Sequence, residues 1–164
     1  CFGKVIGGGL NIGAFGGRAE IMDSMAPDGP VFQAGTLSGN PLATAAGRAA
    51  LALLDDAAYE QLRAAAGRLA GHLEQAFADA GLEVVIPRVS TLVGIHLGAT
   101  APRTYDDART TDVDRYRRFF HAMLERGVAM APGAYEVLFC GLAHTDDVVD
   151  EIGRRAREAA AASA

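Results

Sequence analysis

The pattern of apolar and polar residues predicts three helices in the second part of the chain. Residues 57–80 carry leucine, alanine and phenylalanine at helical spacing and are followed by Gly81, a residue typical of helix C-termini. Residues 112–126 begin with an aspartate, which is typical of an N-cap, and end before Gly127. Residues 145–161 begin with a threonine of the same kind, and the alanine-rich end is expected to fray.

Two earlier helices are also predicted. The longer one begins at Asn40, a good N-cap residue, with Pro41 at the first helical position, and its alanine and leucine content should carry it through Leu54. A short helix is expected over residues 20–25. Residues 1–18 are apolar and interrupted by glycine, which predicts a strand end, a tight turn and a second short strand.

Shorter apolar runs in the last eighty residues predict strands. These runs are residues 82–86, 92–97, 128–130 and 137–142. Residues 87–90 separate the first two runs, and residues 102–111 are polar and predict a loop. Strands combined with helices make this region a small α+β unit.

Composition narrows the class of protein. Half of the 164 residues are hydrophobic, which allows a core, and a formal net charge of -5 argues against a nucleic-acid partner. No stretch approaches the roughly eighteen apolar residues of a membrane helix. Two cysteines and four separated histidines form neither a disulfide framework nor a metal site. We therefore expect a cytoplasmic protein without metal, membrane or nucleic acid.

Lys4 is the only lysine, since the other fourteen basic residues are arginine. It precedes glycines at positions 7–9, and because glycine costs backbone entropy, such a cluster indicates a close approach. Unprotonated lysine forms imines with carbonyl groups. The glycines match neither the dinucleotide pattern G-x-G-x-x-G nor a P-loop, whose lysine follows its glycines. Taken alone, Lys4 could also be an ordinary loop residue.

Residues 34–41 form a second unusual run, Ala-Gly-Thr-Leu-Ser-Gly-Asn-Pro. This run is a capped helix start, and a helix start can itself bind an anion. Together with Lys4 and the glycine-rich residues 13–18, it resembles the cofactor lysine and phosphate loop of glutamate-1-semialdehyde 2,1-aminomutases. These enzymes are class III aminotransferase-like members of the fold-type I family that uses pyridoxal 5'-phosphate (PLP) and pyridoxamine 5'-phosphate (PMP).

The resemblance implies an α/β fold, namely the C-terminal portion of a fold-type I transferase. Residues 1–54 would be the end of the large cofactor domain, residues 55–81 a linking helix, and residues 82–164 a small α+β domain. The chain opens at Cys1 in what should be a buried strand. We therefore expect it to be the C-terminal part of a longer protein.

The resemblance also implies roles for individual residues. Lys4 would hold the cofactor and act in catalysis, while Gly35, Thr36 and Ser38 would bind phosphate. In the family the corresponding threonine reaches the cofactor of the neighbouring subunit, which implies a homodimer. The family's aspartate for the pyridine nitrogen, its other phosphate loop and its stacking aromatic residue precede the lysine. The chain alone should therefore be inactive.

Glu136 helps to choose between the aminomutases and the other class III aminotransferases. The segment of residues 131–145 resembles the aminomutase segment whose glutamate lines the substrate pocket, whereas many class III aminotransferases place a carboxylate-binding arginine in this part of the chain. No arginine occurs between Arg126 and Arg154. Glu136 could also be an ordinary exposed residue. His144 is expected to help cap the last helix.

Three functions remain open from the sequence. The first is conversion of glutamate-1-semialdehyde to 5-aminolevulinate, the precursor of tetrapyrroles. The second is a class III aminotransferase for another amino or oxo acid, because Asn11-Ile12, residues 90–96 and Cys140-Gly141 depart from the aminomutase pattern. The third is an inactive truncated module that binds phosphate or serves as structure.

Overall fold

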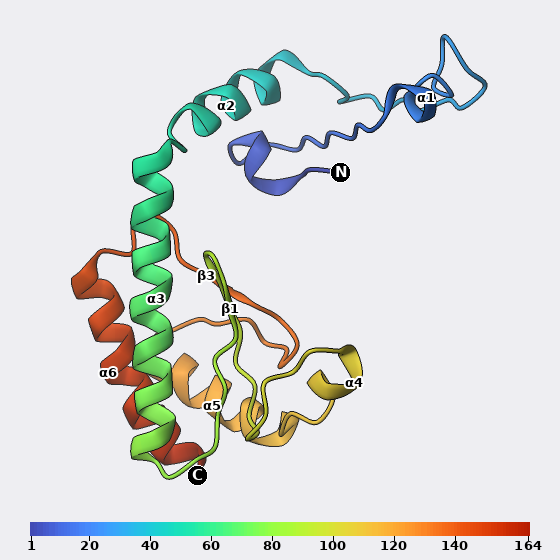
Figure 1. The fold of residues 1–164 in the computed structure, drawn as a ribbon. Helices are drawn as coiled ribbons and strands as arrows, with labels where there is room; N and C mark the ends of the chain where they lie inside the picture. Colours follow the sequence, from blue (N-terminus) through green and yellow to red (C-terminus); the bar gives the residue numbers. More distant parts are fainter. The chain divides into compact units, whose positions relative to one another are not determined.

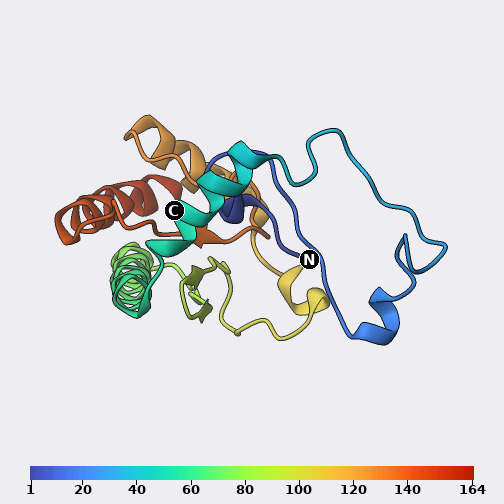
Figure 2. The same ribbon diagram turned by 90° about the horizontal axis from the view of Figure 1, so that it is seen from above.

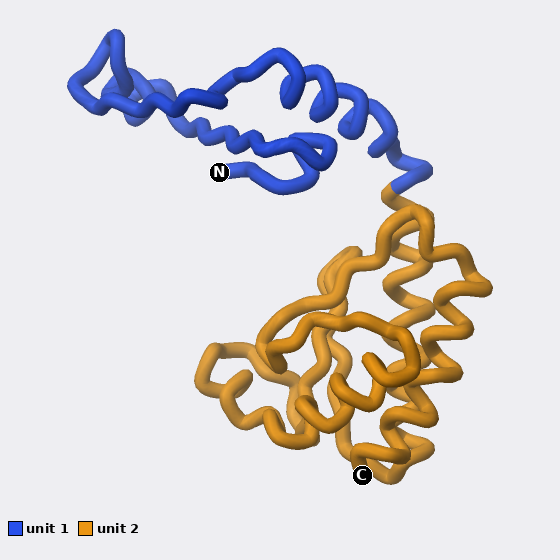
Figure 3. The backbone as a smooth tube through the Cα atoms, turned by 180° about the vertical axis from the view of Figure 1, so that it is seen from behind, with its two compact units in different colours: residues 1–58 blue, residues 59–164 orange.

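The computed structural model describes residues 1–164, which form two compact units, Cys1–Ala58 and Tyr59–Ala164 (Figure 3). The division into residues 1–54, 55–81 and 82–164 stays a prediction. None of the helices has the length and apolar character needed to cross a membrane.

The first unit contains a 3-10 helix and two α-helices: η1 (Lys4–Gly7), α1 (Ala19–Met22) and α2 (Pro41–Ala52). The tight turn predicted near the N-terminus is therefore present as η1. The two strands predicted beside it are not, because Phe2 and Ala14 form only an isolated antiparallel bridge. A ladder needs a continuing partner, and none is present here.

Helix α2 begins where the sequence predicts. The side-chain oxygen of Asn40 accepts hydrogen bonds from the N–H groups of Leu42 (2.9 Å) and Ala43 (3.2 Å). The helix ends at Ala52, two residues before the predicted end, because Leu53 and Leu54 continue only in i→i+3 turns. Helix α1 is likewise shorter than residues 20–25.

The first unit has almost no hydrophobic core. Ala43 is its one buried apolar side chain before the start of α3, whereas large apolar side chains such as Phe2, Phe32 and Leu53 are more than two thirds exposed. Burial of apolar surface is the main driving force of folding. Contacts other than a core must therefore fix the local geometry of this unit.

Helix α3 (Asp56–Asp79) begins with a side-chain cap and ends in a glycine turn. Asp55 accepts a hydrogen bond from the N–H of Ala58 at 2.8 Å. At the other end Gly81 has φ +69°, and the N–H of Leu82 donates to the carbonyl of Phe77. This Schellman arrangement satisfies the last carbonyls of α3, as predicted from Gly81.

A three-stranded antiparallel sheet lies in the second unit, in the order β1-β2-β3. The strands are β1 (Arg88–Val89), β2 (Leu92–Val93) and β3 (Leu138–Phe139). Residues 87–90, which we expected to separate two strands, instead supply β1 and the hairpin turn, with Ser90 at φ +54°. An isolated bridge between Val85 and His96 extends the hairpin. Residues 128–130 form no strand.

The core of this unit lies among α3, α5 (Val113–Glu125), α6 (Asp146–Ser163) and the sheet (Figures 1 and 2). Its largest fully buried side chains include Phe77 and Phe119, whose ring centroids are 4.7 Å apart. The end of α6 does not fray as expected, because Ala159 and Ala160 are fully buried in this core. Packing of this alanine-rich face keeps the last turns of α6 helical.

The segment expected to be a polar loop contains a short helix, α4 (Tyr105–Ala108). Its start is a capping box, in which Thr104 accepts from the N–H of Asp107 and the Asp107 carboxylate accepts from the N–H of Thr104. Two reciprocal bonds satisfy the first turn, so a polar segment forms a helix.

Candidate cofactor-binding site

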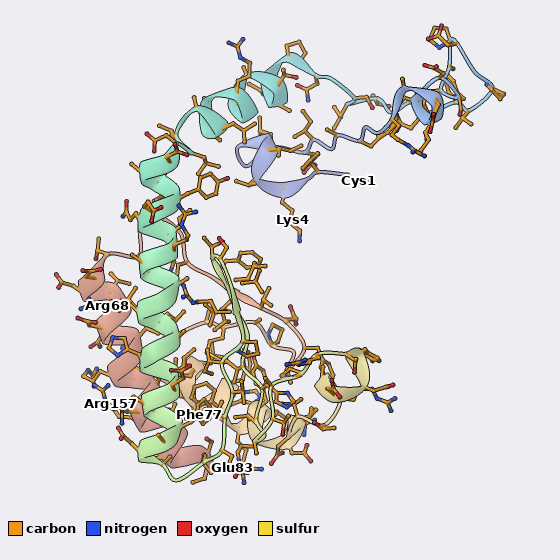
Figure 4. The ribbon with its side chains drawn as sticks, in the orientation of Figure 1. Cys1, Lys4, Arg68, Phe77, Glu83 and Arg157 are labelled. Atoms are coloured by element: carbon orange, nitrogen blue, oxygen red, sulfur yellow. The ribbon has the colours of Figure 1, made fainter.

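Lys4 begins η1 in an unusual backbone conformation. Its φ is +56°, in the left-handed region that a residue with a β-carbon rarely adopts. Figure 4 shows its side chain pointing away from α2, and the residue is exposed. Strain of this kind persists only where surrounding structure imposes it, and it is concentrated at functional sites.

Glycines hold this turn against α2. The backbone of Gly8 lies so close to the carbonyl of Ala46 that a β-carbon on Gly8 would be 2.5 Å from its oxygen. In the same way a β-carbon on Gly47 would lie 2.1 Å from the carbonyl oxygen of Ile6. The glycine cluster predicted a close approach, and the structure shows that the backbone of the Lys4 turn approaches the backbone of α2.

The loop before α2 is closed by two backbone hydrogen bonds. Ser38 donates to the carbonyl of Gly35 (2.9 Å), and Asn40 donates to the carbonyl of Leu37 (3.2 Å). Gly39 has φ +65°, which allows the chain to turn from the loop into the helix. The hydroxyl of Ser38 lies over Gly35, where a β-carbon would be only 3.0 Å from its oxygen.

This loop carries hydrogen-bond donors that have no partner within the chain. They are the backbone N–H groups of Thr36, Leu37 and Gly39 and the hydroxyls of Thr36 and Ser38. Successive N–H groups in a turn form a concave anion site. The set therefore fits a phosphate group.

The first turn of α2 does not offer its own N–H groups, contrary to our expectation for a helix start. Asn40 occupies those of Leu42 and Ala43, Thr44 donates to the carbonyl of Asn40, and Pro41 has no N–H. The helix dipole still favours an anion nearby. Direct donors to an anion at this place would have to come from the preceding loop.

A cavity of about 680 Å³ lies beside this loop. Gly35 and Ser38 line it together with Phe2, Phe15 and Asn11, whereas Lys4 and Thr36 do not. No acidic residue is among the lining residues. Unpaired donors therefore lie beside a space of cofactor size, whereas the acid that a pyridine nitrogen needs is not among the residues that line it.

Glu136 belongs to the second unit and stabilises its own loop. Its carboxylate accepts a hydrogen bond from the N–H of Gly133 at 2.9 Å, and the residue is exposed. The hydroxyl of Tyr116 donates to the carbonyl of Ala131 (2.7 Å) at the start of the same loop. Burial, with a smaller contribution from the charge of Glu136, raises the pKa of Tyr116 to about 12, so this hydroxyl stays a donor.

A cavity of about 400 Å³ adjoins Glu136. Its polar lining includes Tyr105, Tyr135 and His96, of which His96 is buried and has no hydrogen bond through its ring. Sequence reasoning missed His96, since a histidine within an apolar strand gives no signal of a cavity. It also missed Gly47, although a glycine inside an alanine-rich helix is such a signal.

His144 does not cap α6 as expected. The N–H of Gly141 donates to its Nδ1 at 2.9 Å, so the ring closes the preceding turn instead. Thr145 occupies the N-cap position without a side-chain hydrogen bond. No group of three or more histidine, cysteine, aspartate or glutamate side chains is arranged to hold a metal ion.

Comparison with known proteins places this geometry in a family. The aminotransferase class-III family model matches residues 1–152. The glutamate-1-semialdehyde 2,1-aminomutase of Tropheryma whipplei (strain Twist) is 48% identical over 151 residues, which are 92% of this chain and 32% of that protein. The chain spans between 32% and 38% of the length of the curated relatives considered.

Solved structures share the fold. A beta-phenylalanine aminotransferase from Variovorax paradoxus is 29% identical, with a TM-score of 0.77 over 95% of this chain and 36% of that chain. A glutamate-1-semialdehyde aminomutase from Pseudomonas aeruginosa PAO1 in complex with PMP has a TM-score of 0.69 at 24% identity, over 77% of this chain and 28% of that chain. The predicted fold class, part of a fold-type I transferase, is confirmed. The chain belongs to the class-III aminotransferase family.

Proposed function

We propose that the protein containing this chain is a PLP/PMP-dependent aminomutase that converts glutamate-1-semialdehyde to 5-aminolevulinate for tetrapyrrole synthesis. The observation that carries the proposal is the 48% identity, over 92% of this chain, to a protein named for that activity. The reaction is an isomerisation, because an amino group and an oxo group exchange places on adjacent carbons. The bound cofactor supplies a carrier for the amino group and a sink for electrons.

The loop Gly35–Gly39 binds the cofactor phosphate in this proposal. Support comes from its unpaired N–H groups and from the free hydroxyls of Thr36 and Ser38. Hydrogen bonds from such donors to a dianion are stronger than those between neutral groups. The loop is fixed at its end by the capped start of α2 and therefore needs little reordering when it binds.

Lys4 holds the cofactor covalently and then acts as general acid and base. Its Nζ takes a proton from one carbon and returns it to another, which requires a mobile amine on a fixed backbone. The exposed side chain on a strained, glycine-anchored turn supports this role. No other lysine in the chain could replace it.

Glu136 contributes to the substrate pocket. Its carboxylate is held by the N–H of Gly133 and adjoins the cavity of about 400 Å³. A negative charge there attracts the amino group of a substrate and disfavours a second carboxylate. This preference suits a substrate that carries an amino group and one carboxylate.

The active protein is a homodimer in which Thr36 serves the cofactor of the partner subunit. The hydroxyl of Thr36 has no partner within the chain, which leaves it available to a group from outside the chain and supports this role. The extensive exposed apolar surface of the first unit also suits burial in an assembly.

A second candidate is an aminotransferase on the same scaffold. The likeness to a beta-phenylalanine aminotransferase, at a TM-score of 0.77 and 29% identity, favours it, as do the departures at Asn11-Ile12. An aminotransferase consumes one amino donor and one oxo acceptor in each cycle, whereas an aminomutase consumes neither.

The test is turnover of glutamate-1-semialdehyde by the full-length protein without added donor or acceptor. We expect 5-aminolevulinate to form under these conditions. An absolute requirement for an oxo acid would exclude the aminomutase and favour the second candidate. Absence of cofactor binding by the full-length protein would leave only the inactive module.

A further inference from the structure

The backbone of the Lys4 turn is fixed by contact rather than by a hydrophobic core. Lys4 and Gly8 both have φ +56°, and the turn is closed by hydrogen bonds from Gly8 to Val5 (3.1 Å) and from Leu10 to Gly7 (3.0 Å). Short turns of this kind are not stable alone. Something outside the turn must therefore hold Lys4 in its left-handed conformation.

The contact that holds the turn is made by Gly8 and Gly47. The turn lies against the middle of α2 so closely that a β-carbon on either glycine would overlap backbone atoms of Ala46 or Ile6. Backbone atoms cannot rotate away as a side chain can. Helix α2 is otherwise rich in alanine, so glycine at position 47 weakens the helix and is explained by this contact.

The same helix carries the phosphate loop at its start. The Lys4 turn therefore contacts the helix whose N-cap, Asn40, directly follows the loop that contains Thr36 and Ser38. In the proposed homodimer α2 thus connects the lysine of one site to the phosphate loop of the other. We propose that Gly8 and Gly47 are positioning residues, which set the place of Lys4 by locking its turn onto α2. This inference rests on the proposed role of Lys4 in holding the cofactor.

The first test compares Gly47→Ala with wild type in the full-length protein. The added methyl group must displace the turn by about 1 Å, and misplacement on that scale can reduce a reaction rate by about a hundredfold. We expect PLP to bind with little loss of affinity through the phosphate loop. The rate at which Lys4 captures it, followed by borohydride trapping and mass spectrometry, should fall at least about tenfold. The pH profile of the lysine-bound absorption should shift as well.

The matched control is Gly71→Ala in α3, where a β-carbon meets no atom within 4 Å. It should leave both binding and capture unchanged. Wild-type capture and pH profile in Gly47→Ala would overturn the inference. Failure of wild type itself to form any bond between Lys4 and PLP would instead refute the proposed function, so the two outcomes are distinguishable.

A second pair of variants applies if Gly47→Ala does not fold. A β-carbon on Gly7 would lie 2.8 Å from Cγ2 of Ile12, which is a side-chain atom and can be removed. Gly7→Ala should slow capture, and the double variant Gly7→Ala, Ile12→Ala should restore it. Capture that is slow in both, or normal in both, would show that packing of the turn does not set the position of Lys4.

Discussion

Arg68 donates two hydrogen bonds of 2.6 Å to the carboxylate of Asp150, and the pair connects α3 to α6. Nε2 of His72 lies 2.8 Å from the same carboxylate. Hydrogen bonds from Arg68 and then from His72 hold the pKa of Asp150 well below its usual range. The folded chain therefore binds a proton at Asp150 less readily than the unfolded chain does.

Acid should weaken this connection between helices. Because the pKa of Asp150 is lowered by folding, its stabilisation is complete above the unfolded value of about 3.9 and is lost as the pH falls toward the folded value. We expect Asp150→Asn to lower the melting temperature at neutral pH and to reduce its dependence on pH below about 4. Circular-dichroism melts over a pH series measure both effects.

Asp106→Asn is the control for this prediction. The side chain of Asp106 is 90% exposed and its contact with Arg109 is 3.9 Å long, so the change should have little effect. Equal pH dependence in wild type and Asp150→Asn would contradict the proposed contribution of the pair.

Removal of Phe119 should strongly destabilise the second unit. Its ring is fully buried and packs on Phe77 at 4.7 Å, so Phe119→Ala leaves a cavity and should lower the free energy of unfolding by about 3–5 kcal/mol. Urea unfolding followed by circular dichroism measures the loss. Phe139→Ala is the control, since that side chain is 65% exposed, and it should cost less than about 1 kcal/mol. Similar losses of stability in both variants would contradict the placement of Phe119 in the core and of Phe139 outside it.

Helix starts and ends were predictable because their chemistry is local. Asn40, Asp112 and Gly81 are each used as their residue types indicate. The capping box of Thr104 and Asp107 had a readable pattern that was not used. The runs at residues 92–97 and 137–142 do contain β2 and β3, whereas β1 lies in residues 87–90, which were predicted to separate two strands, and residues 128–130 form no strand. The pairing itself, such as that of Leu92 with Phe139, joins residues far apart in the sequence, and local propensity does not encode it.

In the candidate site, too, local features could be predicted from the sequence and contacts between distant residues could not. The motifs point to Lys4 and Thr36, and their assigned roles stay predictions. Which N–H groups are free depends on the side chain of Asn40, and the reason for Gly47 depends on a contact with Ile6. The first is a local cap that an asparagine before a proline already indicates, whereas the second is a tertiary contact that the sequence indicates only by a glycine within an alanine-rich helix.

Glu136→Gln should separate the charge of this residue from its role in the loop. The amide oxygen of glutamine can still accept from the N–H of Gly133, so the loop keeps its shape while the negative charge is lost. In the full-length enzyme we expect KM to rise about tenfold with little change in kcat, as for a contact present throughout the reaction. Glu125→Gln, on the exposed side of α5, is the control. An unchanged KM would assign Glu136 to the loop alone.

Lys4→Ala should abolish the visible absorption of the lysine-bound cofactor in the full-length protein, while PLP still binds through the phosphate loop. Loss of the general acid and base should reduce turnover by about 10²–10⁴-fold, in addition to the loss of the covalent attachment. Lys4→Arg keeps the charge but cannot form the bond, and it should behave like the alanine variant. Absorbance spectra and kcat provide the measurement. Either variant with a wild-type spectrum and turnover would disprove the assignment of Lys4.

Thr36→Val removes one hydroxyl from the phosphate loop and preserves its shape. That hydroxyl has no partner within the chain, and a hydrogen bond to a charged phosphate contributes about 1.5–3 kcal/mol. Affinity for PLP should therefore fall about ten- to a hundredfold, whereas Thr100→Val, at an exposed threonine without a hydrogen bond, should leave it unchanged.

If Thr36 binds the cofactor of the partner subunit, PLP should also favour the dimer by mass action, and less so in the Thr36→Val variant. Cofactor titration combined with sedimentation of the full-length proteins measures both effects. A wild-type protein that binds PLP tightly as a monomer would refute the cross-subunit role of Thr36, because no second subunit would then be needed to complete the site.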